Sequence, residues 1–143
     1  MNPTPDQMRI LAQMAVKAKQ NAYVPYVDFK VGAAILVEDG RIFTGCNVQN
    51  LSFGANVCAE HTAVLKAVSE GARTICAAAV SGPLRDEVTT PCGICRQVIR
   101  EFAASPDIPI LVQNDDGTRQ ICYTLGELLP HAFDRLEEKG ETV

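Results

Sequence analysis

Residues 56–64 read NVCAEHTAV, and residues 90–98 read TPCGICRQV. In each stretch a cysteine stands where a loop enters a helical pattern: Cys58 in the first, and Cys92 with Cys95 in the second. The unpaired N–H groups and the partial positive charge of a helix N-terminus lower the pKa of a cysteine and favour the thiolate, which is the form that binds metals. The two stretches therefore predict a centre that is shared by the starts of two helices.

The rest of the chain places these two helices in an alternating series of helices and strands. The series opens with a capping box, in which Thr4 begins a helix and Gln7 completes the box. The predicted elements are a helix over 4–20, strands over 31–37 and 41–47, a helix over 58–70, a strand over 74–81, a helix over 92–103, strands over 109–114 and 119–124, and a short helix over 125–133.

This order predicts the fold class. Strands separated by helices favour a parallel centre with helices on both faces, whereas hairpin connections favour antiparallel pairs. We therefore expect one α/β domain over residues 1–143: a three-layer α/β/α sandwich around a mixed five-stranded sheet, with an antiparallel pair at each end.

Composition and charge limit the partners. The net charge of −4 argues against a nucleic acid polymer as partner, because proteins that bind one usually present a basic surface to its phosphates. The N-terminal sequence does not resemble a secretory signal, and no apolar run reaches the length of a membrane span, so we expect a cytoplasmic protein with no membrane partner. In a reducing compartment the six cysteines favour metal binding or catalysis over disulfides, and we expect Cys46, Cys76 and Cys122 in the core.

The residue types at the two helix starts favour a catalytic metal centre. Three thiolates from Cys58, Cys92 and Cys95 leave one position of a tetrahedral zinc site open, as in catalytic sites. Glu60 follows two residues after Cys58, where a carboxylate can exchange protons with water at that position. The alternatives are a thioredoxin-like redox pair at Cys92 and Cys95, a buried structural thiol at Cys58, and a Glu60 that only complements the helix dipole.

The whole pattern resembles the small homotetrameric cytidine deaminases. Cys58-Ala59-Glu60 followed by Pro91-Cys92-Gly93-Ile94-Cys95 matches the signature of zinc-dependent nucleobase deaminases. Further similar blocks follow in family order: AYVPYVDFKVGAA, GCNVQNLSFG, CAEHTAVLKAVSEG, PCGICRQVIREF, NDDG and GELLPHAF. Because these blocks span nearly the whole chain, the resemblance is far more specific than a single motif.

The resemblance implies zinc-dependent hydrolysis of cytidine or 2′-deoxycytidine to uridine or deoxyuridine, with release of ammonia and a role in pyrimidine salvage. One zinc ion per subunit would be held by Cys58, Cys92 and Cys95, with Glu60 as the catalytic residue. Other positions match substrate contacts, some of them contributed by neighbouring subunits of a homotetramer: Phe29, Asn47, Gln49, Phe53, Ala59 and Phe133. In the family an arginine offsets the negative charge of the thiolates; here either His61 donates a hydrogen bond to a thiolate, or His61 faces solvent and the helix dipoles and Arg96 supply the offset.

Some positions depart from the family pattern and keep alternatives open. Gln49 stands where the family has Glu, His61 where it has Arg, and Val27 and Leu51 where it often has smaller residues. These changes motivate an alternative substrate, such as a cytidine modified on N4 or on the sugar, or a blasticidin-like nucleoside antibiotic, and they predict that Gln49→Glu raises kcat/KM for cytidine. The non-enzymatic alternative is a zinc-binding interaction protein on the same fold.

Overall fold

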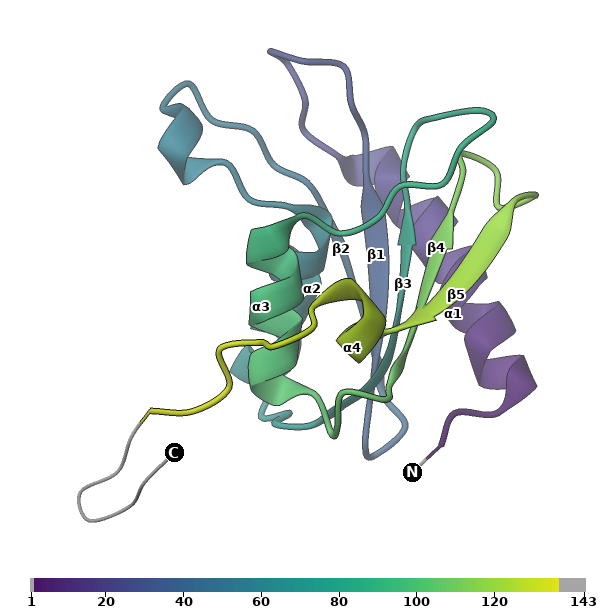
Figure 1. Cartoon of the computed structure of the whole chain (residues 1–143). Coiled ribbons are helices and arrows are strands. Elements are labelled where there is room, and N and C mark those ends of the chain that lie inside the picture. The colour runs from purple at the N-terminus through teal and green to yellow at the C-terminus, as the bar shows by residue number, and fades with distance from the viewer. Residues whose placement is uncertain (1, 137–143) are drawn as a thin grey trace.

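The computed structural model describes residues 2–136 of the chain (Figure 1). One mixed sheet has the strand order β2-β1-β3-β4-β5. Its members are β1 (Gly32–Val37), β2 (Ile42–Cys46), β3 (Ile75–Ser81), β4 (Pro109–Gln113) and β5 (Gln120–Thr124). The predicted antiparallel pairs at the two ends are confirmed, but the predicted parallel centre is reduced to the single pair β3–β4, because β1 also runs antiparallel to β3.

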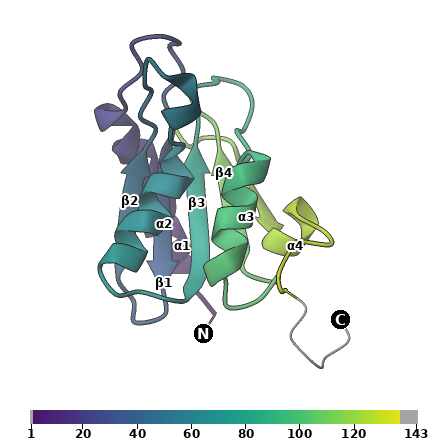
Figure 2. The same cartoon turned by 90° about the vertical axis from the view of Figure 1, so that its left-hand side faces the viewer.

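Helices cover both faces of the sheet, so the predicted three-layer α/β/α sandwich is confirmed. One face carries α1 (Pro5–Ala18), and the other carries α2 (Ala59–Ser69) and α3 (Gly93–Phe102), as Figures 1 and 2 show from two sides. The shorter elements are α4 (Leu125–Leu128) and two 3-10 helices, η1 (Lys19–Asn21) and η2 (Phe53–Ala55). The capping box of Thr4 and Gln7 starts α1 as predicted.

Strand β1 is buried on both faces, and its residues alternate between two apolar cores. Ala33, Ile35 and Val37 belong to the core under α2 and α3, whereas Ala34 and Leu36 belong to the core under α1. This is the apolar composition expected of a strand covered from both sides. Burying side chains in two cores fixes the register of the sheet, because a slip of one residue would exchange its two faces.

A close approach of strand β2 to helix α2 fixes where the helix begins. A Cβ atom on Gly45 would lie 2.4 Å from the carbonyl oxygen of Ala59 and 2.6 Å from the nitrogen of Ala63. Only glycine allows this separation, since any side chain at position 45 would push the first turn of α2 away from the sheet. The position of Cys58, which precedes that turn, therefore depends on a glycine in the neighbouring strand.

Three connections meet at one end of the strands, the upper end of the sheet in Figure 1. Gly32, at the start of β1, pairs with Cys46 at the end of β2 and with Ser81 at the end of β3. The segments before β1, after β2 and after β3 therefore begin side by side. The last two of these segments lead into α2 and α3. This end of the sheet therefore brings together the two helix starts at which the sequence predicts a metal centre.

The segment after β3 is held at this end of the sheet largely through hydrogen bonds to its main chain. The amide N–H of Asp115 donates to the carbonyl of Leu84 at 2.9 Å, and the Asn114 side chain donates to the carbonyl of Arg85 at 2.7 Å. The buried Lys19 ammonium donates to the carbonyl of Gly82 at 3.2 Å and to the Asp115 carboxylate at 2.8 Å. These bonds fix the path of the chain toward α3.

Two predictions need correction. The last helix ends at Leu128 rather than continuing to residue 133, because Leu129 leaves the helical conformation and Pro130 cannot donate a helical hydrogen bond. The prediction that Cys122 is a core residue is wrong: it lies exposed on the edge strand β5, whereas Cys76 is buried and Cys46 is half-buried. Among residues 2–136, no helix combines the length and the apolar character needed to cross a membrane.

Candidate metal centre

The starts of α2 and α3 bring three thiols together. Cys58 is the N-cap residue of α2, Cys92 is the N-cap residue of α3, and Cys95 is fully buried in the first turn of α3. Their three sulfur atoms all lie within 4.8 Å of one another, and the Sγ atoms of Cys58 and Cys92 are 3.7 Å apart. All three residues are free cysteines.

This geometry fits a tetrahedral zinc ion. Zinc–sulfur bonds of about 2.3 Å at tetrahedral angles place neighbouring sulfur atoms about 3.8 Å apart. The cluster is already close to that spacing, and thiolates are the ligands that structural and catalytic zinc sites share. Three protein ligands leave one coordination position open, which is the arrangement of a catalytic rather than a structural site.

The thiols differ in their acidity. The Cys95 thiol donates a hydrogen bond to the Cys58 sulfur and lowers the pKa of Cys58 to about 6, with further contributions from Cys92 and from the charge of His61. The same bond raises the pKa of Cys95, and burial and the nearby Glu60 raise it further. Of these two thiols Cys58 ionises more readily, and metal binding must displace the proton of Cys95.

Glu60 is the buried acid of the centre. It occupies the second position of α2 and keeps only 4% of its surface exposed. Burial raises the pKa of its carboxyl group to about 7, and the negative charge on Cys58 raises it as well. A carboxyl group that titrates near neutral pH can both accept and donate protons, so its environment suits general acid–base work.

The two residues expected to offset the thiolate charge lie differently. His61 is half-buried, and its positive charge contributes to the low pKa of Cys58. Arg96 instead supports the chain on both sides of the cluster: it donates to the carbonyl of Pro91 at 2.7 Å and to the carbonyl of Leu128. Across residues 2–136, neither side chain donates a hydrogen bond to a thiol of the cluster.

The three aromatic side chains expected at the substrate form what we call the aromatic rim: Phe29, Phe53 and Phe133. All three are exposed, by 36%, 68% and 66%. Phe53 contacts Tyr26 edge to face, with ring centroids 6.1 Å apart. Phe133 lies in the segment after α4, which Gln97 holds to α3 by donating to the Phe133 carbonyl at 2.6 Å.

The resemblance assigns Asn47 and Gln49 to the sugar. In the structure their side-chain amides form hydrogen bonds with the main chain of the loop before β1. Asn47 accepts from the N–H of Val31 at 2.9 Å and donates to the carbonyl of Phe29 at 2.7 Å. Gln49 bonds to the backbone of Tyr26 and Val27. Sequence reasoning missed this role, although the two amides separated by one residue after a strand are the signal that could have indicated it.

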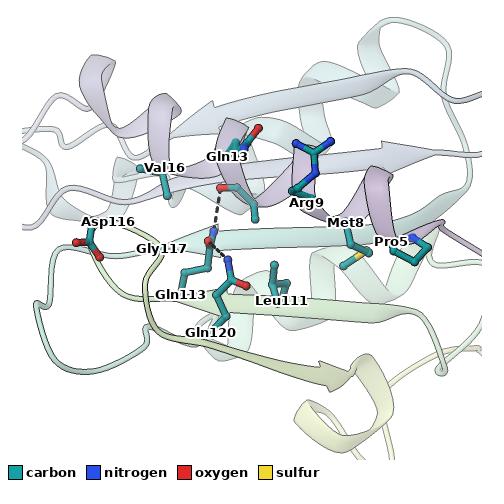
Figure 3. Close-up of a pocket in the computed structure, with 11 residues that line it drawn as sticks. Pro5, Met8, Arg9, Gln13, Val16, Leu111, Gln113, Asp116, Gly117 and Gln120 are labelled. Carbon is teal, nitrogen blue, oxygen red and sulfur yellow. Dashed lines mark hydrogen bonds between the residues drawn. The ribbon is translucent and has the colours of Figure 1, made fainter.

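A cavity of about 640 Å³ lies elsewhere, between α1 and the strands β4 and β5 (Figure 3). The thiols do not line it, and its buried polar group is already paired: Gln113 donates to the carbonyl of Ala12 at 3.0 Å and accepts from Gln120 at 2.9 Å. No cysteine or histidine is among the described residues that line this cavity, so we assign the metal chemistry to the thiol cluster on the other side of the sheet.

The mixed sheet, the three thiols and the buried carboxyl group together define a zinc-binding domain of the hydrolytic type. The family model described as the cytidine and deoxycytidylate deaminase zinc-binding region matches residues 5–110, and the chain belongs to this family.

Individual relatives and solved structures agree with the family model. A cytidine deaminase of Sporosarcina psychrophila is 44% identical over 91% of this chain and 93% of its own. The crystal structure of cytidine deaminase from Burkholderia pseudomallei superposes with a TM-score of 0.81 at 41% identity, over 87% of this chain and 98% of that chain. For cytidine deaminase from Mycobacterium tuberculosis the TM-score is 0.74 at 42% identity, over 90% of this chain and 98% of that chain.

Proposed function

We propose that this chain is a zinc-dependent hydrolase that converts cytidine and 2′-deoxycytidine to uridine and deoxyuridine and releases ammonia. Membership of the family and relatives of 44% identity named cytidine deaminase support the reaction. The observation that carries the proposal is the buried Glu60 beside three thiols at zinc spacing. A redox pair or a purely structural metal site needs no carboxyl group at that position.

Each residue of the centre has a distinct role in this proposal. Cys58, Cys92 and Cys95 would hold one zinc ion per chain, and zinc when bound supplies Lewis-acid chemistry that lowers the pKa of water toward neutrality. Glu60 takes the proton of the water that attacks C4 of the pyrimidine ring and delivers it to ring N3. Glu60 then carries the remaining proton of that water, now on the C4 hydroxyl, to the exocyclic amino group. The C4–N bond breaks, ammonia leaves and the C4 carbonyl forms, so one water molecule is consumed for each ammonia released.

The substrate contacts are also proposed. Phe29 stacks on the pyrimidine, and the main chain at Ala59, the residue between Cys58 and Glu60, meets the edge of the base. Asn47 and Gln49 lie beside the sugar. Phe53 and Phe133 complete the pockets of neighbouring subunits in a homotetramer, and their exposure in the single chain supports this assignment.

The cellular setting is proposed from the same features. We assign the protein to pyrimidine salvage in the cytoplasm, acting on free nucleosides rather than on a nucleic acid polymer or at a membrane. The net charge of −4 supports a small-molecule substrate over a polymer. We also propose that residues 1–143 act as a single catalytic domain, which is supported by the one continuous sheet.

The test is ammonia release by zinc-loaded protein from cytidine, 2′-deoxycytidine, N4-substituted cytidines and free cytosine, with Glu60→Ala as control. We expect turnover of cytidine and deoxycytidine, and loss of it in the control. Turnover of modified cytidines alone would favour a redirected pocket. Zinc-loaded protein that releases ammonia from none of these compounds would contradict the proposal in favour of a zinc-binding interaction protein.

A further inference from the structure

Three hydrogen bonds join the Gln49 side chain to one short stretch of main chain. The Oε1 atom of Gln49 accepts from the N–H of Tyr26 at 3.0 Å and from the N–H of Val27 at 3.1 Å. Its Nε2 atom donates to the carbonyl of Val27 at 2.8 Å. We propose that Gln49 is a positioning residue, which clamps residues 26–31 in the conformation that presents Phe29, and that this clamp requires an amide. This inference rests on the proposed function, in which Phe29 contacts the base.

The balance of donors and acceptors explains why an amide is required. A carboxylate can accept the two N–H groups, but it has no hydrogen to donate and would place a charged oxygen against the carbonyl of Val27. In the observed arrangement both lone pairs of Oε1 are used, so Gln49 offers a ligand only the second hydrogen of Nε2. All three of these Gln49 hydrogen bonds go to the loop, and Oε1 has no lone pair left to accept a hydrogen bond from a sugar hydroxyl.

Besides the Gln49 bonds, the loop is held by the contact of the Tyr26 ring with Phe53 and by Asn47. Tyr26, Val27 and Phe29 are exposed by 45%, 62% and 36%, so apolar burial does not fix their conformation. Asn47 supplies a second pair of bonds, to Phe29 and Val31, at the other end of the stretch. Two amide side chains from one segment therefore hold the stretch at both ends, and the main chain of Phe29 is one of the points of attachment.

The segment that carries the clamp also leads to the metal centre. The backbone of Val48 exchanges two hydrogen bonds with Val57, at 2.9 and 3.0 Å, and Val57 directly precedes Cys58. The backbone N–H of Gln49 donates to the carbonyl of Tyr23 at 2.9 Å. Because one short segment is bonded to both sides, the loop of Phe29 is placed relative to the thiol cluster through residues 47–49.

Loss of the clamp should affect binding more than chemistry. When only a fraction of molecules holds the binding conformation, the apparent affinity falls by that fraction. A neutral hydrogen bond is worth about fivefold in such an equilibrium, so loss of all three bonds shifts the loop equilibrium by up to about a hundredfold. Because Asn47 still holds the other end of the stretch, we expect KM for cytidine to rise by about tenfold or more. The value of kcat should change much less, because Glu60 and the thiols do not contact Gln49.

The experiment compares Gln49→Met, which removes all three bonds at similar size, with Gln49→Glu, which keeps only the acceptors. Gln20→Met and Gln20→Glu are the matched controls, since Gln20 is exposed and, within residues 2–136, makes no side-chain hydrogen bond. Hydrogen exchange of the peptide that spans residues 26–31 is measured together with kcat, KM and bound zinc. The sequence alone predicts a higher kcat/KM for Gln49→Glu, but the bond from Nε2 to Val27 reverses that expectation. We expect exchange and KM to rise from wild type through Gln49→Glu to Gln49→Met, with unchanged zinc and unchanged controls.

Three results would overturn the inference. Unchanged exchange in Gln49→Met would show that the clamp does not hold the loop, and faster exchange with unchanged KM would show that the loop does not position the substrate. A Gln49→Glu variant with a lower KM than wild type would show that position 49 acts directly on the sugar as an acceptor. Wild-type protein that releases no ammonia would contradict the proposed function instead, and hydrogen exchange would still decide whether the clamp exists.

Discussion

The thiol cluster and the aromatic rim are built in opposite ways. The cluster is formed at two helix starts, and its member Cys95 and the nearby Glu60 are both buried. The rim is exposed, and its loops are held by polar side chains and main-chain bonds. The difference indicates that one chain assembles the reactive groups by burial, whereas the exposed aromatic side chains depend on how their loops are held.

The largest expected effect comes from removing a buried ligand of the cluster. Cys95→Ser should lose bound zinc and all ammonia release, because a neutral hydroxyl is a poor replacement for the third thiolate. Metal analysis of the purified protein measures the first effect directly. Cys122→Ser is the matched control, since Cys122 is exposed on β5, and it should keep about one zinc per chain. Full zinc content in Cys95→Ser would contradict the assignment of the centre.

Next in size is the loss of proton transfer. Glu60→Gln keeps the shape of the side chain but cannot accept a proton, so kcat should fall by about 10²- to 10⁴-fold. Zinc content should not change, because Glu60 is not among the three ligands. Metal analysis together with steady-state kinetics separates this result from that of Cys95→Ser. A kcat within about threefold of wild type would exclude general acid–base work by Glu60.

The same carboxyl group should make the stability of the metal-free protein depend on pH. Burial raises the folded-state pKa of Glu60 from 4.5 to about 7, so its stabilising contribution is complete below pH 4.5 and is lost as the pH rises through 7. At about 1.4 kcal/mol per pKa unit, the loss amounts to about 3 kcal/mol. Urea unfolding of metal-free wild type and Glu60→Gln at pH 5 and pH 8 should show this difference. Parallel pH profiles of the two proteins would refute it.

A smaller effect is expected where the cluster depends on the sheet. Gly45→Ala places a methyl group against the first turn of α2 and should lower the free energy of unfolding by about 1–3 kcal/mol. The control is Gly54→Ala in η2, where an added Cβ meets no atom within 4 Å. Urea titration measures both variants. Equal stability of the two would mean that α2 can move away from β2 without cost.

The smallest expected effect is a difference in thiol reactivity. In metal-free protein at pH 7, iodoacetamide should modify Cys58 about tenfold faster than Cys122, since the thiolate is the reactive form. Hydrogen bonding from Cys95 lowers the pKa of Cys58 to about 6, whereas burial raises the pKa of Cys122. Peptide mass spectrometry follows the two rates. Faster labelling of the more exposed Cys122 would show that access outweighs acidity.

Much of the architecture could be predicted because its signals are local. The cap at Thr4, the alternation of helices and strands, and the cysteines at helix starts all depend on residues that are near one another in sequence. The extent of parallel pairing could not be predicted from element order. The direction of β1 relative to β3 is set by how the β1–β2 hairpin adds to the sheet, which is a long-range choice.

The errors and omissions have a common physical cause. Cys122 lies in an apolar run, but β5 is an edge strand, so part of that run faces solvent. The amides of Asn47 and Gln49 were assigned to the sugar because their partners on residues 26–31 are about twenty positions away in sequence. A polar side chain on a loop selects its partners from the tertiary structure, so the local pattern of two amides separated by one residue can indicate the role but not the partners.

The attachment of the segment after β3 has a consequence for how this protein can vary over evolution. Asn114 and Asp115 hold that segment through the carbonyl groups of Leu84 and Arg85, which every residue type possesses. Substitutions at positions 84 and 85 can therefore change the chemistry of the surface while the path of the chain toward Cys92 is preserved. The surface of this segment can therefore diversify at these two positions without disturbing the helix start that carries Cys92 and Cys95.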